Sequence, residues 1–483
     1  MKTNRFFKQW VLELSVLIAV TAVAWACGDE ETSDTETGDT ESETETESEE
    51  APALTADEAE AHCPGDLDKS ADGFECTIKG LYSEDSVESA DALVWVEGMT
   101  YVLNGIVGIE EESTLTIEPG AVILGDPDSA ETNPSSLFIA RGSKLIAEGT
   151  ADKPIVFSSA NPSGERQAGD WGGIVIRGNA PFQISDTLSE YVDYTAAFGG
   201  DDALDSSGSL AYLDISFCGR KEVTGDSGAR STNGLTLKGV GAGTEIHHIH
   251  VHRSADGGVV MQGGTVSLKH MVVTGAAESA FAWLEGWQGR AQFGIAAALK
   301  GVSSAYGIMG INNSNKDEAD AKPRSAPTLY NFTIAGQGDA GTSALMLSDG
   351  TAGILANILV TEETAYATCV DIEGVSTWEQ TIGDLLIVNG SIFPERSGCF
   401  PSEDETGYSE DLWWSDGDEN RLTNAVLVPS EDGTRPGFLP ETEAVQSGAA
   451  APPAGVAFLE TVSYVGAVGD EDWTAGWTAF PEN

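Results

Sequence analysis

Basic residues are scarce in this chain. Its 483 residues include 24 Lys and Arg against 78 Asp and Glu, which gives a formal net charge of −54. No block of Lys or Arg supplies the basic face that displaces counterions from phosphates, so we exclude a nucleic-acid partner. Six cysteines are too few for a zinc ribbon or a small disulfide-stapled scaffold. Amphipathic helical stretches longer than two turns are also scarce, which leaves a body of strands and turns.

Long apolar runs are absent except near the N-terminus. Residues 10–26 form the only such stretch; Lys2, Arg5 and Lys8 lie before or at the edge of it, and it ends in Ala-Trp-Ala-Cys. Small residues at this point are typical of export cleavage, and the following Cys27 fits the lipobox of bacterial lipoproteins. We therefore expect residues 1–26 to be a lipoprotein signal peptide and Cys27 to be a lipid anchor. Ordinary cleavage at the same bond, which leaves Cys27 as a free thiol, is the alternative.

The segment after the expected anchor is strongly acidic. Residues 28–50 contain twelve acidic side chains and no basic one. Such a segment repels itself and has no apolar surface to bury, so we expect residues 27–60 to be a disordered tether. Gly28, not Asp, follows Cys27, which favours the outer membrane or cell surface as the location. Residues 63–483 still hold 62 acidic and 21 basic residues, a difference of −41, which indicates a solvated anionic exterior.

Four cysteines are candidates for disulfides, which an exported chain can form. Cys63 and Cys76 are close in sequence, as are Cys369 and Cys399. Pairing of neighbours is the simplest of the three connectivities that these four allow. Cys218 is then expected to be a lone buried thiol on a strand.

The segment between Cys63 and Cys76 also resembles a calcium-binding loop. It contains Asp66, Asp68 and Asp72. An EF-hand loop, however, requires Gly where this chain has Ala71. We favour a disulfide-closed segment or cap over residues 61–93 and expect no cofactor, with Ca²⁺ or a transition metal as the alternative.

An apolar repeat runs through the second half of the chain. Each repeat has apolar residues at its first, fourth and sixth positions. The repeats are Leu210-Leu213-Ile215, Ile246-Ile249-Val251, Leu268-Met271-Val273, Leu329-Phe332-Ile334, Leu355-Ile358-Val360, Ile382-Leu385-Ile387 and Leu422-Ala425-Leu427. Three of the six intervals are 22, 26 and 27 residues, about one coil of a parallel β-helix, and the longer ones have room for an insertion or an additional coil. Period-2 alternation places Ile249 and Val251 inside, in ladders with Met271 and Val273. We predict a right-handed parallel β-helix over residues 94–435 and a wrapping or capping segment over 436–483.

The alignment of the repeats also predicts outward columns. The third position of the successive repeats is occupied by Tyr212, His248, His270, Asn331, Asn357, Asp384 and Asn424. His248 and His270 are expected to stack in adjacent coils, at about the strand spacing of 4.8 Å. Imidazoles so placed, with His250 on the same strand, are candidate ligands of a transition metal. A polar surface ladder without metal is the alternative.

Exposed aromatic side chains are candidates for stacking on sugars. Trp283 and Trp287, with Tyr212 and Asp214, are the candidate glycan-binding residues, although burial in the core or at a coil end is the favoured reading for most Trp residues. Hydrolysis requires two carboxyl groups across the scissile bond, and Asp214 is one outward candidate. Because acidic residues at turns beside Gly are more often turn formers, we assign no catalytic residue.

Several motifs resemble a known family. They are GDWGGIVIRGNAP at 169–181, LTIEPG at 115–120, ARGSKLIAEGT at 140–150, NGLTL at 233–237, EGW at 285–287 and DWTAGWT at 472–478. In this combination they resemble the large secreted or lipid-anchored bacterial β-helix proteins. The resemblance implies a pectate-lyase-like right-handed β-helix on the cell surface, in a family of mostly uncharacterised function.

These observations lead to one expected role and one alternative. We expect a surface-anchored, non-enzymatic β-helix lipoprotein that binds or supports something outside the cell. Its partners would be the membrane, through the lipid, and an extracellular glycan or another surface protein. The alternative is a carbohydrate-active enzyme, a polysaccharide lyase or glycoside hydrolase, that uses the solvent face of the coils.

Overall fold

The computed structural model describes residues 54–70, 73–128, 134–183, 197–225, 228–336, 341–363, 366–401, 409–430, 435–441 and 443–481. The expected signal peptide, Cys27 and most of the expected tether lie outside these ranges, as does Asp72. Among the described residues, no helix is long and apolar enough to cross a membrane.

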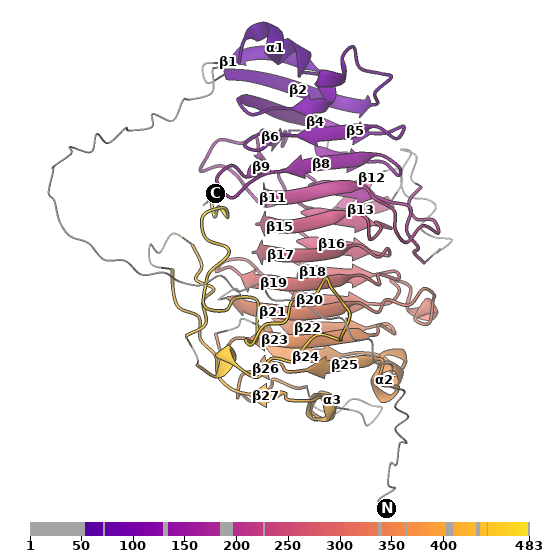
Figure 1. Cartoon of the computed structure of the whole chain (residues 1–483), viewed down its shortest axis with the longest axis vertical. Coiled ribbons are helices and arrows are strands. Elements are labelled where there is room, and N and C mark those ends of the chain that lie inside the picture. The colour runs from indigo at the N-terminus through magenta and orange to yellow at the C-terminus, as the bar shows by residue number, and fades with distance from the viewer. Residues whose placement is uncertain are drawn as a thin grey trace, which may run out of the picture. The chain divides into compact units, whose positions relative to one another are not determined.

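Three stacks of parallel strands form a triangular coil, so the predicted parallel β-helix is confirmed (Figure 1). Sheet 1 contains the second half of β4 (Met99–Ile109), β7 (Ser136–Ile139), β10 (Ile174–Arg177), β14 (Leu235–Lys238), β16 (Val259–Gln262), β18 (Ser279–Leu284), β20 (Tyr306–Ile311), β22 (Gly341–Ser348) and β24 (Tyr366–Ile372). Sheet 2 contains β3 (Val94–Trp95), β5 (Thr114–Ile117), β8 (Lys144–Glu148), the first halves of β11 (Gly208–Ser216), β15 (Glu245–His252), β17 (Ser267–Thr274), β19 (Arg290–Ala298), β21 (Thr328–Gly336) and β23 (Gly353–Val360), and β25 (Leu386–Asn389). Sheet 3 contains the first half of β2 (Gly73–Tyr82), whose second half pairs with β4 in sheet 1, and the first half of β4, β6 (Val122–Gly125) and β9 (Ile155–Ser159). It continues with the second halves of β11, β15, β17, β19, β21 and β23, and with β26 (Ile392–Phe393) and β27 (Arg421–Leu422).

A single residue in the left-handed conformation turns each long strand from sheet 2 into sheet 3. These residues have φ between 51° and 61° and are Tyr212, His248, His270, Phe293, Asn331 and Asn357. Left-handed φ is uncommon for side chains other than Gly, Asn and Asp, so the corner imposes backbone strain that the stacked coils must hold. The predicted third column is therefore the corner of the coil.

The interior of the coil is a set of apolar ladders. Ile249 pairs in register with Met271, and Val251 with Val273, and all four side chains are fully buried. The predicted ladders are confirmed. Stacking of this kind removes nearly all of each aliphatic side chain from water, which is worth about 1.5–3 kcal/mol per side chain.

The long interval between the third and fourth repeats contains an additional coil, as its length allowed. Strand β19 supplies this coil, with Gly294 in register with Met271 and with Phe332. A Cβ on Gly294 would lie 2.1 Å from the Phe332 ring, so the large ring of one coil fills the space left by the small residue above it. Because Gly stands where the neighbouring coils have Met271 and Phe332, the apolar repeat cannot be recognised in the sequence of this coil. The interval before Ile246 contains a separate antiparallel hairpin, β12 (Arg220–Gly225) and β13 (Gly228–Thr232).

The last two predicted repeats are wrong in register. Leu355 pairs with Val388, not with Ile382, and Gly390, with a φ of 58°, continues the corner in place of Asp384. Ile382 instead ends helix α2 (Val375–Ile382). Likewise, Leu422 lies on β27, which pairs with β26, so the Leu422-Ala425-Leu427 repeat does not align with the coils. The false repeat combined Ile382 at the end of α2, the exposed Leu385 after it and Ile387 on β25, whose spacing matches the repeat by chance.

The two ends of the coil are closed differently (Figure 1). At the N-terminal end, α1 (Ala56–Ala61) and the antiparallel hairpin of β1 (Asp66–Ser70) with β2 cover the first coil. At the other end, α2 and α3 (Glu410–Asp416) cover the last. Short 3-10 turns accompany them at Ala90–Leu93, Lys316–Glu318 and Glu443–Gln446.

Both predicted neighbour disulfides are present. Cys63 bonds to Cys76, and Cys369 bonds to Cys399. Cys63–Cys76 lies near the N-terminal end of the coil, and Cys369–Cys399 lies near the other end. Cys218 is a free, fully buried thiol, as expected, but it lies in the turn between β11 and β12 and not on a strand.

Residues after β27 run back along the outside of the coils as a strap, which we define as residues 436–481 (Figure 1). Its apolar side chains pack on the outward face of sheet 3, where Val465 contacts the cluster of Leu359 and Ile392, and Val468 contacts that of Val272 and Ile295. Side-chain amides of the corner fasten its backbone. Asn357 Nδ2 donates to Ala450 O at 3.0 Å and its Oδ1 accepts from Ala450 N at 2.7 Å.

Candidate functional site

Four corner side chains form a continuous ring stack. The centroid distances are 4.3 Å from Tyr212 to His248, 4.5 Å from His248 to His270 and 4.9 Å from His270 to Phe293, with interplanar angles of 15–21°. The predicted stacking of His248 on His270 is confirmed. Because the left-handed corner repeats once per coil, it places each ring directly above the next.

The strap covers this stack with two indoles. The ring centroid of Trp473 lies 4.9 Å from that of His270, and the centroid of Trp477 lies 5.6 Å from that of His248 and 5.7 Å from that of Tyr212, with the rings 71–87° apart in orientation. Edge-to-face contacts between aromatic rings are favourable and directional. The corner stack and the strap therefore form one aromatic cluster.

The DWTAGWT motif at 472–478 is explained by this packing. Asp472 Oδ1 accepts hydrogen bonds from the backbone N–H and the hydroxyl of Thr474, and Oδ2 pairs with Arg435 at 2.8 Å. Trp473 Nε1 donates to Ala467 O, and Trp477 Nε1 donates to Trp473 O, both at 2.9 Å. The motif fixes the strap in the shape that presents both indoles to the corner.

Asp214 lies beneath the last strap residues and is almost fully buried. It accepts hydrogen bonds from Ser216 Oγ at 2.7 Å and from Ala479 N at 2.9 Å, and its Oδ2 lies 3.2 Å from His250 Nδ1. Burial raises the pKa of the Asp214 carboxyl, but His250 and these hydrogen bonds outweigh it and hold the pKa below its usual value. The carboxylate is thus a buried, fully engaged acceptor.

Thr274 links His250 to a second buried imidazole. Its Oγ1 lies 3.3 Å from His250 Nε2 and 2.7 Å from His252 Nδ1, and His252 Nε2 lies 3.2 Å from Pro481 O. Burial lowers the pKa of His252 to about 3, with a further contribution from His250. His252 is therefore neutral at neutral pH and hydrogen-bonds the end of the strap.

The corner histidines are also held neutral. Burial is the main cause that lowers the pKa of His248 to about 3 and that of His270 to about 4; His270 adds to the effect on His248. Two imidazolium rings stacked at 4.5 Å would repel each other. The cluster favours a pH at which both rings are uncharged.

The histidines expected to bind a metal do not share one site. Within the described ranges, no three His, Cys, Asp or Glu side chains are grouped so that they could hold a metal ion. Both ring nitrogens of His250 are engaged by Asp214 and Thr274, while His248 and His270 use their faces for stacking. This donor set fits packing and hydrogen bonding better than metal coordination.

The residues expected to bind a glycan are separated. Trp283 and Trp287 are fully buried inside the coil, where no sugar ring can stack on them; their Nε1 atoms donate to Thr351 Oγ1 and Val266 O. Asp214 lies beneath the strap, and Tyr212 belongs to the corner stack. The core-filling reading of the two indoles is the one that the structure supports.

A charged cluster on sheet 1 was not identified from the sequence. Arg177 pairs in register with Lys238, and Lys238 interacts electrostatically with Glu285. Lys238 Nζ lies 5.4 Å from the Phe198 ring centroid, and the Arg177 guanidinium lies 5.1 Å from that of Phe138. Such cation–π contacts are typical of cations removed from water.

Burial brings the pKa values of Lys238 and Glu285 closer together. It lowers the pKa of Lys238 to about 8 and raises that of Glu285, whose Oε1 accepts a hydrogen bond from Ser314 Oγ at 2.9 Å. Glu285 Oε2 is buried and has no hydrogen-bond partner among the described residues. Shifted pKa values of this kind are common among groups that act as general acids or bases, and also in structural ion-pair networks. All three members lie in or next to family motifs, at 169–181, 233–237 and 285–287, which was the signal available in the sequence.

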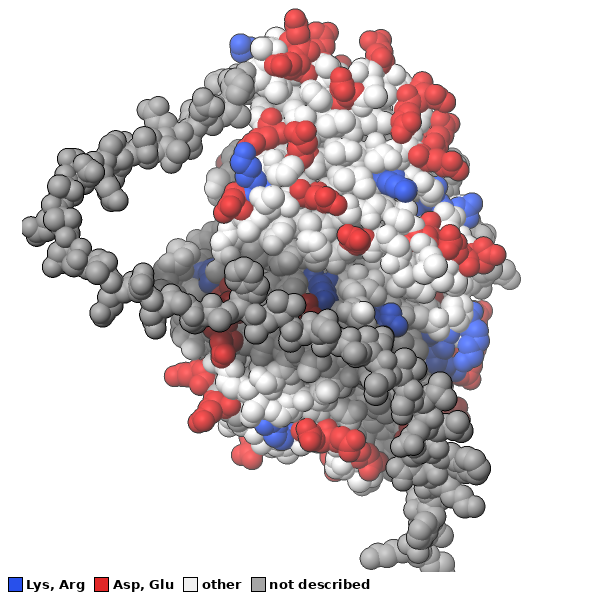
Figure 2. Space-filling model, in the orientation of Figure 1, with Lys and Arg blue, Asp and Glu red and all other residues white. Residues whose placement is uncertain are grey.

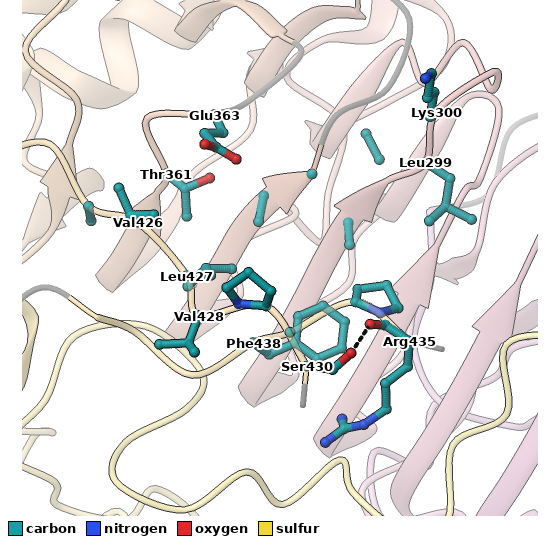
Figure 3. A pocket seen from close by; sticks show the side chains of 18 residues that line it. Leu299, Lys300, Thr361, Glu363, Val426, Leu427, Val428, Ser430, Arg435 and Phe438 are labelled. Carbon is teal, nitrogen blue, oxygen red and sulfur yellow. Dashed lines mark hydrogen bonds between the residues drawn. The ribbon is translucent and has the colours of Figure 1, made fainter. Parts of the chain in front are cut away.

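The cavities of the described structure include one on sheet 3 and two beside α2. Figure 3 shows one of ≈420 Å³, between the small side chains of sheet 3, such as Ala297 and Ala335, and residues 425–430 and 435–438. Lys300 and Glu363 lie on opposite rims, and Phe438 closes one side. A second, of ≈740 Å³, and a third, of ≈490 Å³, lie beside α2 at the end of the coil.

Comparison with known proteins gives one match. A family model described as a pectate-lyase-like β-helix domain matches residues 87–426. No curated protein and no solved structure matches the chain. The matched range covers most of the chain and coincides with the stacked coils, from before β3 to just after β27, and the chain therefore belongs to the pectate-lyase-like β-helix domain family.

Proposed function

We propose that this protein is a lipid-anchored β-helix of the outer membrane or cell surface that binds or supports an extracellular partner and does not catalyse a reaction. Cys27 would carry the lipid, and the acidic segment after it would hold the coils away from the membrane. The anionic exterior supports a place in water outside the cell (Figure 2).

The observation that carries this proposal is the strap. In an enzyme built on a solenoid, outward side chains must be open to substrate. Here the outward Asp214 and His250 are buried beneath the chain's own C-terminal residues. Their partners are strap atoms and neighbouring hydroxyls, so this polar group stabilises the closed coil.

The anchoring is tested with the full chain expressed in a Gram-negative host. We expect the wild type to fractionate with membranes and Cys27→Ser to be released in soluble form. Mass spectrometry of the N-terminal peptide should show an acylated cysteine. A wild-type chain that is processed at the same bond but carries an unmodified Cys27 thiol would contradict the anchor.

The charged cluster of Arg177, Lys238 and Glu285 favours the alternative, a polysaccharide lyase or glycoside hydrolase. A glycan array followed by product analysis decides between the two functions. Binding without cleavage supports the proposed role, and cleavage that is lost in Glu285→Gln and Lys238→Gln establishes the enzyme. Lys144→Gln, an exposed Lys on β8, is the matched control for the loss of one positive charge.

A further inference from the structure

The end of the coil formed by α2 and α3 exposes apolar side chains. Among the described residues, eight large hydrophobic side chains are exposed, and five of them lie between residues 375 and 422. Those five are Val375, Ile382, Leu385, Leu412 and Leu422. The terminal caps of solenoid proteins need a polar outer face for solubility, so this end departs from what a cap alone requires.

Helix α2 shows the departure most clearly. It buries Thr377 and Gln380 together with Trp378, and it exposes Val375 and Ile382 at its two ends, so polar and apolar side chains are only partly sorted between its inner and outer faces. The buried polar groups are satisfied, since Thr377 Oγ1 accepts from Gly350 N at 2.9 Å and Gln380 Nε2 donates to Ser376 O at 2.9 Å. The outward apolar residues have no such structural role.

A cleft lies between α2, β25 and α3. Its volume is ≈490 Å³, and Trp378 and Trp413 are among the side chains that line it. The exposed Ile382 and Leu412 lie on its rim, 56% and 58% exposed, and Leu385 adjoins it. This volume is in the range of sites that take up apolar side chains of a ligand.

Carboxylates surround the cleft. Asp384, Asp416 and Asp418 line it, and no Lys or Arg does among the residues that the structure describes. The second hollow, of ≈740 Å³, to which α2 contributes Val375 and Ser376, is lined by five acidic residues and one Lys. The acidic residues are Asp317, Glu318, Asp320, Asp349 and Glu373. The helix thus separates an apolar cleft with an acidic rim from an acidic hollow.

We propose that the α2–α3 end of the coil docks an amphipathic, basic segment of another protein, with its apolar side chains in the cleft and its Lys or Arg side chains against the carboxylates. Charge complementarity selects this partner over a second copy, because two copies would bring Asp384, Asp416 and Asp418 against the same residues. This inference rests on the proposed binding role and names the class of partner.

The test uses the full chain and a short synthetic peptide of Leu and Lys in helical amphipathic order. Two matched peptides serve as controls, one with Ser in place of Leu and one with Glu in place of Lys. Binding is measured by fluorescence anisotropy of the labelled peptide. We expect only the Leu/Lys peptide to bind tightly, with an affinity that falls as salt is raised.

Two double variants locate the site. Ile382→Ser with Leu412→Ser, and Asp384→Asn with Asp416→Asn, should each weaken binding roughly tenfold or more. Leu204→Ser, at an exposed position outside this end, and Asp57→Asn with Glu60→Gln, on α1, are the matched controls and should leave binding unchanged. All substituted side chains are exposed, so circular dichroism should show native folding in every variant.

Three outcomes would overturn the proposal. One is equal binding of the Ser/Lys and Leu/Lys peptides, or equal losses for the α1 and cleft carboxylate variants, which would show attraction to net charge alone. Another is unchanged binding by the Ile382→Ser, Leu412→Ser variant. The third is a wild-type dimer in sedimentation that this variant makes monomeric, which would assign the cleft to a second copy. The anchoring and glycan experiments are independent of these results, so failure of this inference is distinguishable from failure of the proposed function.

Discussion

The two ends of the coil solve the same problem in different ways. At the N-terminal end, α1 turns Asp57, Glu58 and Glu60 to solvent and buries Ala59, with a capping box between Thr55 and Glu58. At the other end, α2 and α3 bury Trp378, Trp413 and Trp414 and turn apolar residues to solvent. At both ends the helices cover open strands and exclude water from the outermost ladder.

The difference separates closing the coil from presenting a surface. A polar cap completes the first task and prevents association. The C-terminal end completes it with buried indoles and, in addition, keeps an apolar cleft with an acidic rim. The polar helix α1 is sufficient to close one end of the coil, whereas the other end has exposed apolar side chains and a cleft that closing the coil does not require.

The largest expected effect comes from removing the aromatic closure of one end. Trp414 stacks on Phe393 with centroids 4.0 Å apart, and Trp95 stacks on Tyr101 at 5.0 Å. Trp414→Ala and Trp95→Ala should each cost about 3–5 kcal/mol of the local free energy of unfolding. Hydrogen exchange read by mass spectrometry should show the loss only in the coils next to the substituted end, because each coil contacts only its neighbours. Loss of protection at both ends from either substitution would contradict independent closure.

Removing a disulfide should give the next largest loss of stability, and the loss should differ between the two disulfides. Cys369–Cys399 closes a sequence separation of 30 residues and Cys63–Cys76 one of 13. If a disulfide stabilises by lowering the entropy of the unfolded chain, removing the one that closes the longer loop lowers the free energy of unfolding by about 3.6 kcal/mol, and removing the other lowers it by about 2.9 kcal/mol. Paired Cys→Ser variants followed by chemical denaturation should place the C-terminal pair as the more costly. The opposite order would indicate that the reduced N-terminal hairpin unravels further than its loop length implies.

Acid should loosen the strap and leave α1 in place. His252 has a pKa of about 3 in the folded chain against an ordinary value near 6.5, so its contribution is complete above about pH 6.5 and is lost as the pH falls toward 3. At pH 5 this loss is about 2 kcal/mol for His252. Hydrogen exchange at pH 7 and pH 5, corrected for intrinsic rates, should show lower protection in residues 464–481 at pH 5. His252→Gln should reduce the difference, whereas equal losses in α1 would point to general acid unfolding.

The sequence predicted the coils and the segments that close them, but not the contacts that those segments make. The ladders of Ile249 and Val251 were readable because each coil repeats the same apolar spacing. Gly294 interrupted the pattern because Phe332 fills its space, and Ile382 extended the pattern falsely because α2 exposes it. The strap contacts and the pairing of Lys238 with Arg177 join residues far apart in the chain, and one sequence has no period that records them.

The smallest effect on stability is expected for the exposed apolar side chains of the α2–α3 end, and it tests directly whether that end does more than close the coil. Ile382→Ser and Leu412→Ser remove side chains that are more than half exposed, so each should change the free energy of unfolding by no more than about 0.5 kcal/mol. Ala59→Ser, at the buried position of α1, should cost more, because it places a hydroxyl against the first ladder. Chemical denaturation of the three variants measures this order. If Ile382→Ser or Leu412→Ser proved as costly as Ala59→Ser, these side chains would be part of the closure and their exposure would need no partner. If both are neutral, the coil does not require them, and the reason for keeping apolar residues in water at this end must lie in what binds there.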